Sequence, residues 1–145
     1  MTVALSGKEV GKEVTEHFHD CVLSSDDTSI IVVPEHLFEV AEFLKNSHFA
    51  FDYLVNLTSV DYLDYLEVVY NLVSLEHNHS VTLKVRCHDR DNPTVQSVVA
   101  LWKGADLQER EVYDLMGIGF DGHPNLKRIV LWEGFQGHPL RKDYL

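Results

Sequence analysis

Residues 66–75 read Leu-Glu-Val-Val-Tyr-Asn-Leu-Val-Ser-Leu, and residues 81–88 read Val-Thr-Leu-Lys-Val-Arg-Cys-His. The first stretch is apolar on both of its faces, which favours a strand in the interior of a sheet. The second alternates apolar and polar residues strictly, which indicates a strand with one polar face. A short polar turn at residues 76–80 separates them. The two stretches therefore predict an antiparallel hairpin at the centre of a sheet.

The residues before this hairpin predict alternating helices and strands. Apolar residues recur every four positions from Val10 to Val22, which predicts an amphipathic helix over residues 7–23. Pro34 suits the first position of a second helix, because its missing N–H would be unpaired there in any case. The remaining elements predicted in this part are a strand at residues 28–33, a half-buried strand at 51–57 and a turn at 61–64.

The residues after the hairpin predict helices. Residues 95–102 carry apolar side chains at helical spacing, which predicts a short helix that ends near Gly104. Asp106 with Glu109 three positions later has the pattern of a capping box, and the helix that it starts is expected to end at Gly117.

This order of elements predicts an α+β fold in two layers. A mostly antiparallel or mixed sheet is expected to carry helices on one face, and an extended irregular C-terminal tail is expected to follow. We assign residues 1–116 to the α+β domain and residues 117–145 to the tail. The length of 145 residues and the 45% hydrophobic content fit one globular domain.

Charge and cysteine content exclude several classes of function. Residues 1–80 hold 14 acidic and 3 basic residues, whereas residues 81–145 hold 9 of each. An acidic body argues against binding of nucleic acid and against direct docking on anionic lipid. Cys21 and Cys87 form no C-x-x-C pattern, so this chain is not expected to hold an iron–sulfur cluster or a cysteine zinc site.

The expected tail is rich in glycine and proline, yet it is also apolar. Residues 117–145 contain five of the eight glycines and two of the four prolines, together with eleven large apolar residues. Ordering such a stretch costs roughly 1–2 kcal/mol per residue. At roughly 25 cal/mol per Å², offsetting that cost needs on the order of 1,200–2,400 Å² of apolar burial. A small domain can hardly supply that area, so the tail is predicted to lie on another protein.

Several sequence motifs lack the structural context that their usual function requires. Residues 117–122 spell G-x-G-x-x-G, but the motif follows a helix and no helix opens after it, which argues against a dinucleotide site. His77 and His79 share a turn without a third ligand at a recognised spacing. Cys87 and His88 point to opposite faces of a strand and cannot pair. An independent enzyme or a metal protein that uses the histidines stays open as an alternative.

Charged residues gather on the last helix and in the tail. Asp114 lies in the last helical turn, where the backbone dipole disfavours an anion. A cation is therefore expected beside it, from Arg110 four positions earlier, from the tail or from a partner. The triplet Gly-His-Pro occurs at residues 122–124 and again at 137–139, and basic residues follow it both times. The repetition is typical of a docking device, because arginine in such a segment contacts carboxylates with two hydrogen bonds.

Residues 106–145 resemble a known family. Glu109-Arg110-Glu111, Asp114-Leu115-Met116, His123, the run at 127–130 and the closing run at 137–144 are similar to the signature of the thirty-kilodalton subunit of respiratory complex I. That protein is the C subunit of bacterial NADH:quinone oxidoreductase and the J subunit of cyanobacterial and chloroplast complexes.

The resemblance implies a non-catalytic subunit in the peripheral arm of a proton-translocating NADH:quinone oxidoreductase. Such a subunit binds no cofactor, since FMN and the iron–sulfur clusters belong to partner subunits, and the isolated chain is expected to have no activity. The implied partners are the forty-nine-kilodalton subunit, near the site of quinone reduction, and the cluster-bearing subunits. The implied location is the cytoplasmic side of the cell membrane, reached through the complex. The partner contacts would be made by Glu109, Arg110, Glu111, Asp114, His123, Pro124, Lys127, Arg128, His138, Pro139, Arg141, Lys142 and Asp143.

Two alternatives to this function remain. The same kind of domain occurs in membrane-bound [NiFe] hydrogenases, formate hydrogenlyases and F420H2 dehydrogenases, and the chain is compatible with each. A stand-alone binding module outside bioenergetics is also compatible. The proteins that co-purify with the chain distinguish these possibilities.

Overall fold

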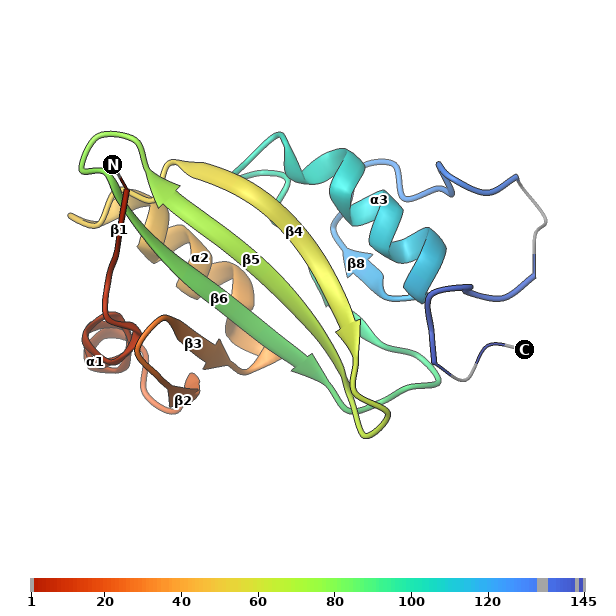
Figure 1. The fold of residues 1–145 in the computed structure, drawn as a ribbon, viewed down its shortest axis with the longest axis horizontal. Coiled ribbons are helices and arrows are strands. Elements are labelled where there is room, and N and C mark those ends of the chain that lie inside the picture. The colour runs from red at the N-terminus through yellow and green to blue at the C-terminus, as the bar shows by residue number, and fades with distance from the viewer. Residues whose placement is uncertain (1, 133–135, 143, 145) are drawn as a thin grey trace.

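The computed structural model describes residues 2–132, 136–142 and 144, and its centre is a six-stranded mixed sheet (Figure 1). The strand order is β2-β3-β6-β5-β4, and the short β1 also pairs with β6. A separate two-stranded sheet joins β7 to β8. The strands are β1 (Val3–Ala4), β2 (Val22–Ser25), β3 (Ser29–Val32), β4 (Tyr53–Asp61), β5 (Leu66–Ser74), β6 (His79–Cys87), β7 (Thr94–Gln96) and β8 (Gly119–Asp121). The helices are α1 (Gly7–His17), η1 (Pro34–His36), α2 (Leu37–Asn46) and α3 (Ala105–Met116).

The predicted central hairpin is confirmed. Strands β5 and β6 pair in antiparallel register, with Leu66 opposite Cys87 and Leu72 opposite Val81. Leu66, Leu72 and Leu83 are fully buried on the face of the hairpin that carries the core. The α+β class is thereby confirmed, and the mixed character of the sheet comes from β1 and β3, which both run parallel to β6.

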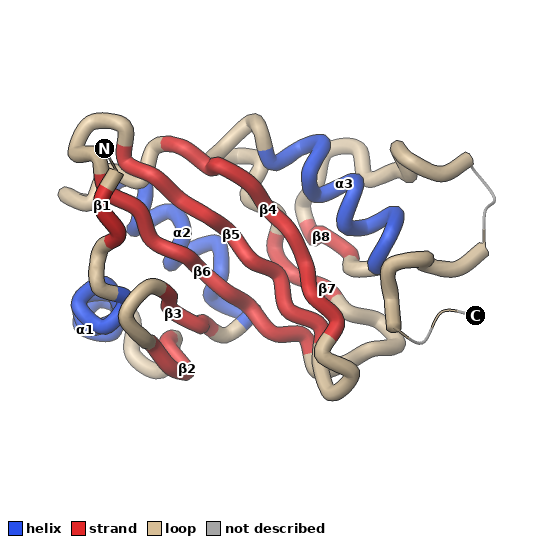
Figure 2. Tube along the Cα trace, in the orientation of Figure 1, coloured by secondary structure: helices blue, strands red, loops and turns tan. Residues whose placement is uncertain are grey.

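The helices cover one face of the large sheet. Helix α2 runs behind the strands in Figure 1, and α1 and α3 lie beside the two ends of the strand order. Ile30 of β3 lies next to Leu83 in the register, so both point to the same face, and α1 packs Gly11 against Ile30 there. At the other end Gln108 of α3 reaches the backbone of Leu57 in β4. Figure 2 shows how the tail then runs as a loop beyond α3.

The first predicted helix is too long. Helix α1 ends at His17, and Val22 lies in β2 opposite Val32 of β3. The chain turns between them through Asp20, whose φ of 62° is left-handed. Val22 continues the four-residue spacing, but pairing with β3 gives its backbone better partners than another helical turn would.

The predicted helix over residues 95–104 is wrong. Residues 94–96 form strand β7, in which Val95 lies opposite Phe120 of β8, and both side chains are buried. Turns occupy the residues between β7 and α3. The predicted capping box is also wrong, because α3 begins after Gly104 without a side-chain cap and Glu109 points into the interior. The predicted end of this helix at Gly117 is confirmed.

Strand β8 follows the predicted division at residue 116 and pairs with β7, which precedes helix α3. The division into a domain and a tail stays a prediction. Among the described residues, no helix has the length and apolar character needed to cross a membrane.

Replacing Gly7 with alanine is expected to destabilise the fold strongly. A Cβ atom at Gly7 would clash with the carbonyl oxygens of Ser29 and Asp26, so α1 would have to move off the turn between β2 and β3. We expect a loss of about 1–3 kcal/mol, measured by chemical denaturation. Gly104→Ala is the matched control, because nothing lies within 4 Å of its Cβ position. Equal stability of the two variants would contradict this packing.

Candidate docking site

Asp114, near the end of α3, binds residues 128–131 of the tail. Its side chain is fully buried, and its Oδ2 accepts hydrogen bonds from the backbone N–H groups of Ile129 (3.1 Å), Val130 (2.7 Å) and Leu131 (2.8 Å). Its Oδ1 lies 3.2 Å from Nη1 of Arg128. One carboxylate therefore fixes four consecutive tail residues against the helix.

The pKa of Asp114 reflects this environment. Burial alone raises the pKa, but the N–H groups of Leu131, Val130 and Ile129, helped by the Arg128 guanidinium, bring it below its ordinary value. The cation expected beside Asp114 is thus supplied by the tail. Arg110 does not serve this role, because its Nε donates to the carbonyl oxygen of Lys127 at 3.2 Å.

The second half of the tail caps the end of α3. The last carbonyl groups of a helix have no partner within the helix and need one from elsewhere. Gly117, in the left-handed conformation at φ 75°, supplies the first N–H, and the tail supplies the others. The four bonds are Gly117 N–H to Tyr113 O (3.0 Å), His138 Nδ1 to Asp114 O (3.0 Å), Leu140 N–H to Leu115 O (3.0 Å) and Arg141 Nε to Met116 O (2.6 Å).

Asp61 anchors the end of the tail to the large sheet. Its carboxylate accepts two hydrogen bonds from Arg90, at 2.6 and 2.9 Å, and one from the backbone N–H of Lys142 at 2.9 Å. Arg141 also donates to the carbonyl oxygen of Arg90 at 2.9 Å. The Arg90 guanidinium holds the pKa of Asp61 far below its ordinary value, so the anchor is charged at neutral pH.

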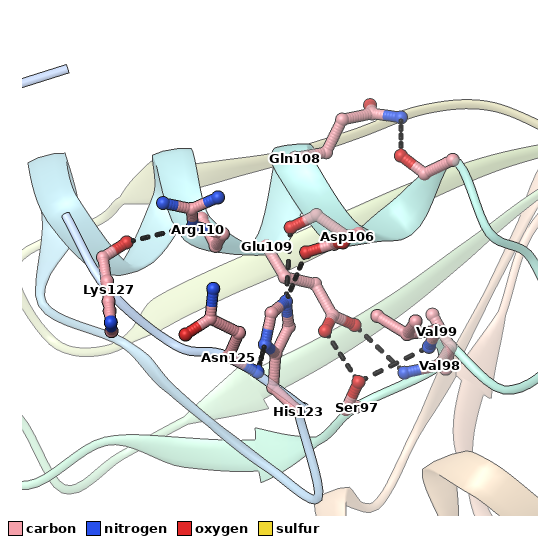
Figure 3. A network of polar contacts seen from close by, with 11 residues as sticks. Ser97, Val98, Val99, Asp106, Gln108, Glu109, Arg110, His123, Asn125 and Lys127 are labelled. Carbon is pink, nitrogen blue, oxygen red and sulfur yellow. Dashed lines mark hydrogen bonds and ion pairs between the residues drawn. The ribbon is translucent and has the colours of Figure 1, made fainter. Parts of the chain in front are cut away.

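The start of the tail is held by His123, as Figure 3 shows. The ring is fully buried, and its Nδ1 accepts the backbone N–H of Asn125 at 2.9 Å. Its Nε2 therefore carries the proton, and this atom lies 3.1 Å from the carbonyl oxygen of Asp106 and 3.0 Å from the Asp106 carboxylate. The histidines of both Gly-His-Pro triplets thus bind the backbone of α3, one near each end.

Glu109 occupies the interior behind His123 (Figure 3). Its carboxylate accepts hydrogen bonds from Ser97 Oγ at 2.6 Å and from the backbone N–H of Val98 at 2.8 Å. The side chain is fully buried, and this burial raises its pKa above the ordinary value although the two hydrogen bonds act in the opposite direction. Glu109 therefore ties α3 to the loop after β7.

Beyond residue 128 the tail binds inward through polar groups and exposes large apolar side chains, whereas Ile118 and Phe120 at its start are buried. Among the described residues of the tail, five large apolar ones are exposed to 41% or more: Ile129, Val130, Trp132, Leu140 and Tyr144. Val130 shows the division best, since its N–H is bonded to Asp114 and its side chain is 56% exposed. We call these five exposed side chains the apolar ridge. The polar groups of the same segment bind α3 and Asp61.

The thirteen residues predicted to contact a partner fall into three groups. The side chains of seven bind within the chain: Glu109, Arg110, Asp114, His123, Arg128, His138 and Arg141. Five others are Glu111, Pro124, Lys127 and Lys142, which are exposed, and Pro139, which is half-buried. Asp143 lies outside the described residues. The partner-binding role of the set stays a prediction.

Sequence reasoning missed Asp61, Arg90 and Ser97. Asp61 lies 29 positions from Arg90 and 81 positions from Lys142, so no local pattern connects them. Across the described residues no group of three histidine, cysteine or acidic side chains is placed to hold a metal ion.

Comparison with known proteins gives the family. The family model described as "Respiratory-chain NADH dehydrogenase, 30 Kd subunit" matches residues 30–145. The chain belongs to this family. It is 42% identical to the C subunit of NADH-quinone oxidoreductase from Roseiflexus sp. strain RS-1, over 97% of this chain and 85% of that protein. It is 45% identical to the protein of the same name from Moorella thermoacetica, over 81% and 80%.

Family membership confirms the resemblance found in the C-terminal signature, and it makes the chain a subunit of a respiratory complex. A solved structure of the membrane-bound sulfane sulfur reductase, an archaeal respiratory membrane complex, contains a similar chain. The similarity covers 95% of this 30 kDa family member and 85% of the other chain, with a TM-score of 0.76 and 23% identity. At that identity the likeness concerns the fold alone.

Proposed function

We propose that this family member is a non-catalytic docking subunit of the peripheral arm of a proton-translocating NADH:quinone oxidoreductase. Its tail lies on the forty-nine-kilodalton subunit and holds that subunit in register with the cluster-bearing subunits. FMN and the iron–sulfur clusters are bound by those partners, and this chain binds no cofactor. It reaches the cytoplasmic side of the membrane through the complex, and electron transfer takes place in its neighbours.

One observation carries this proposal: residues 128–131 are fixed by polar bonds to Asp114, yet large apolar side chains of the same stretch are exposed. A tail that only completed its own fold would turn Val130 and Trp132 inward, yet their side chains are 56% and 68% exposed. Several large apolar side chains exposed on one short segment are typical of an interaction site. The backbone bonds to Asp114 and α3 hold that surface ready, so a partner has little ordering cost to meet on binding.

Serine in place of both Val130 and Trp132 is expected to abolish recovery of the complex. Buried aromatic anchors dominate the binding energy of interfaces, so we expect at least about a tenfold loss of assembled complex on a native gel. The three N–H groups that bind Asp114 belong to the backbone, so hydrogen exchange at residues 129–131 should stay slow in the lone variant chain. Leu75→Ser is the matched control, since Leu75 is 62% exposed in the turn after β5.

Normal assembly with lost electron transfer in the double variant would contradict a docking role. The proteins recovered with the wild-type chain also separate the related complexes. NADH-binding flavin subunits support the proposal, whereas a nickel subunit with paired cysteines would assign the chain to a hydrogenase-type relative.

A further inference from the structure

A pocket of about 180 Å³ lies between β4 and the C-terminal half of α3. Its walls include Leu57 from the strand, Val112 and Leu115 from the helix, and Leu140 from the tail. A water molecule takes about 30 Å³ in the liquid, so this space matches one aliphatic side chain and excludes a large cofactor. The pocket is continuous with the apolar ridge, because Leu140 belongs to both.

The strand beside the pocket has an open edge. Within the residues that the structure describes, strand β4 is the last in the sheet and pairs only with β5. The N–H of Leu57 points away from β5, since Gln108 Oε1 accepts it at 2.6 Å. Backbone direction alternates along an antiparallel strand, so Ser59, two residues further on, also points its N–H and C=O to the outer edge. That edge can receive an extended segment of another chain.

The rim of the pocket carries a negative charge without a counter-ion. Glu111 is exposed there, and within the described part of the chain its carboxylate forms no ion pair or hydrogen bond. Strand β4 belongs to residues 1–80, which have an excess of 11 acidic residues. A partner segment at this edge therefore needs a basic residue, because an acidic one would be repelled.

We propose that this pocket receives an extended segment of the neighbouring subunit that places an aliphatic side chain between β4 and α3. A lysine or arginine within two positions of that side chain pairs with Glu111, and the segment runs along the β4 edge at Ser59. This inference rests on the proposed function, since it names the chemistry of the partner at one point of the same surface.

The test is photo-crosslinking in the purified complex. Benzoylphenylalanine replaces Ser59, and as a control it replaces Leu23, which is 57% exposed on the strand at the opposite edge of the sheet. Mass spectrometry is expected to find position 59 joined to a neighbouring subunit, within a peptide that has an aliphatic residue next to a lysine or arginine. A crosslink within this chain, a peptide without that pattern, or no crosslink would overturn the inference.

Charge reversal gives a second, independent readout. Glu111→Lys is expected to weaken retention of the crosslinked subunit at least about tenfold at low salt, and less at high salt because ions screen the pair. The reciprocal lysine- or arginine-to-glutamate change in the identified peptide should restore retention. Glu76→Lys, in the turn after β5, is the control for net charge. Failure of both crosslink and rescue, with assembly still dependent on Val130 and Trp132, would overturn the pocket's occupant and leave the proposed function standing.

Discussion

Replacing Asp114 with asparagine is expected to free residues 128–131 from helix α3. The carboxylate has no access to solvent, and the substitution removes the negative charge 3.2 Å from the Arg128 guanidinium and presents an amide to three backbone N–H groups. Removing one member of a buried ion pair typically costs about 3–5 kcal/mol. We expect that loss to appear in the tail, because the core under the central sheet does not involve Asp114.

Hydrogen exchange measured along the chain checks this expectation. The amides of Ile129, Val130 and Leu131 should exchange much faster in the variant, whereas those of β5 and β6 should keep their protection. Assembly of the respiratory complex should fall together with tail protection. Asp121→Asn is the control, since Asp121 is an exposed carboxylate a few residues along the chain. Unchanged protection of residues 129–131 would show that Asp114 does not hold the tail.

Replacing Glu109 with alanine is expected to destabilise the whole domain. The change opens a cavity behind His123 and leaves the N–H of Val98 and the hydroxyl of Ser97 without their acceptor. We expect a loss of roughly 2–5 kcal/mol in the free energy of unfolding, measured with urea. Glu109→Gln keeps the shape and can accept from Val98 while donating to Ser97, so it should lose far less. Equal losses would show that volume, and not hydrogen bonding, is what Glu109 contributes.

The raised pKa of Glu109 also predicts that the stability of the fold depends on pH, and the Glu109→Gln variant tests this. Burial raises the folded-state pKa of Glu109 above the ordinary 4.5, so the folded state binds this proton more tightly than the unfolded chain does. The contribution to stability is therefore fully present below about pH 4.5 and is lost as the pH rises through the folded-state pKa. Glutamine does not titrate, so Glu109→Gln should remove this slope from the urea midpoint. Asp61 and Asp114 act oppositely, because their lowered pKa values stabilise the fold above about pH 3.8.

The correctly predicted elements are those in which the hydrophobic pattern and the pairing partner favour the same secondary structure. Strands β5 and β6 follow each other through a short turn, so their apolar pattern and their pairing are both local. Val22 and Val95 show the opposite case, because each also fits a helical spacing. Their partners, Val32 and Phe120, lie 10 and 25 positions away and decide for a strand.

The residues of the site were predicted from the sequence, and the structure adds the contacts that they make within the chain, while their binding to a partner stays a prediction. The charged helix and the two Gly-His-Pro triplets drew attention to Asp114, His123 and His138, and all three prove to be central. The prediction from sequence considers only the apolar area that must be buried to order the tail. On that basis the whole tail is predicted to need a partner. In the structure α3 and Asp61 bind polar groups of the tail, while several apolar side chains between residues 129 and 144 stay exposed. Composition counts both kinds of atom together and cannot make that division.

The anchor at Asp61 has a consequence for the timing of biogenesis. A ribosome makes Asp61 81 residues before Lys142, so the carboxylate and Arg90 emerge long before the segment that they finally hold. Helix α3 likewise waits for residues 138–141 to cap its end. A chain that stops before residue 138 therefore lacks the groups that cap α3 and the backbone N–H that Asp61 binds.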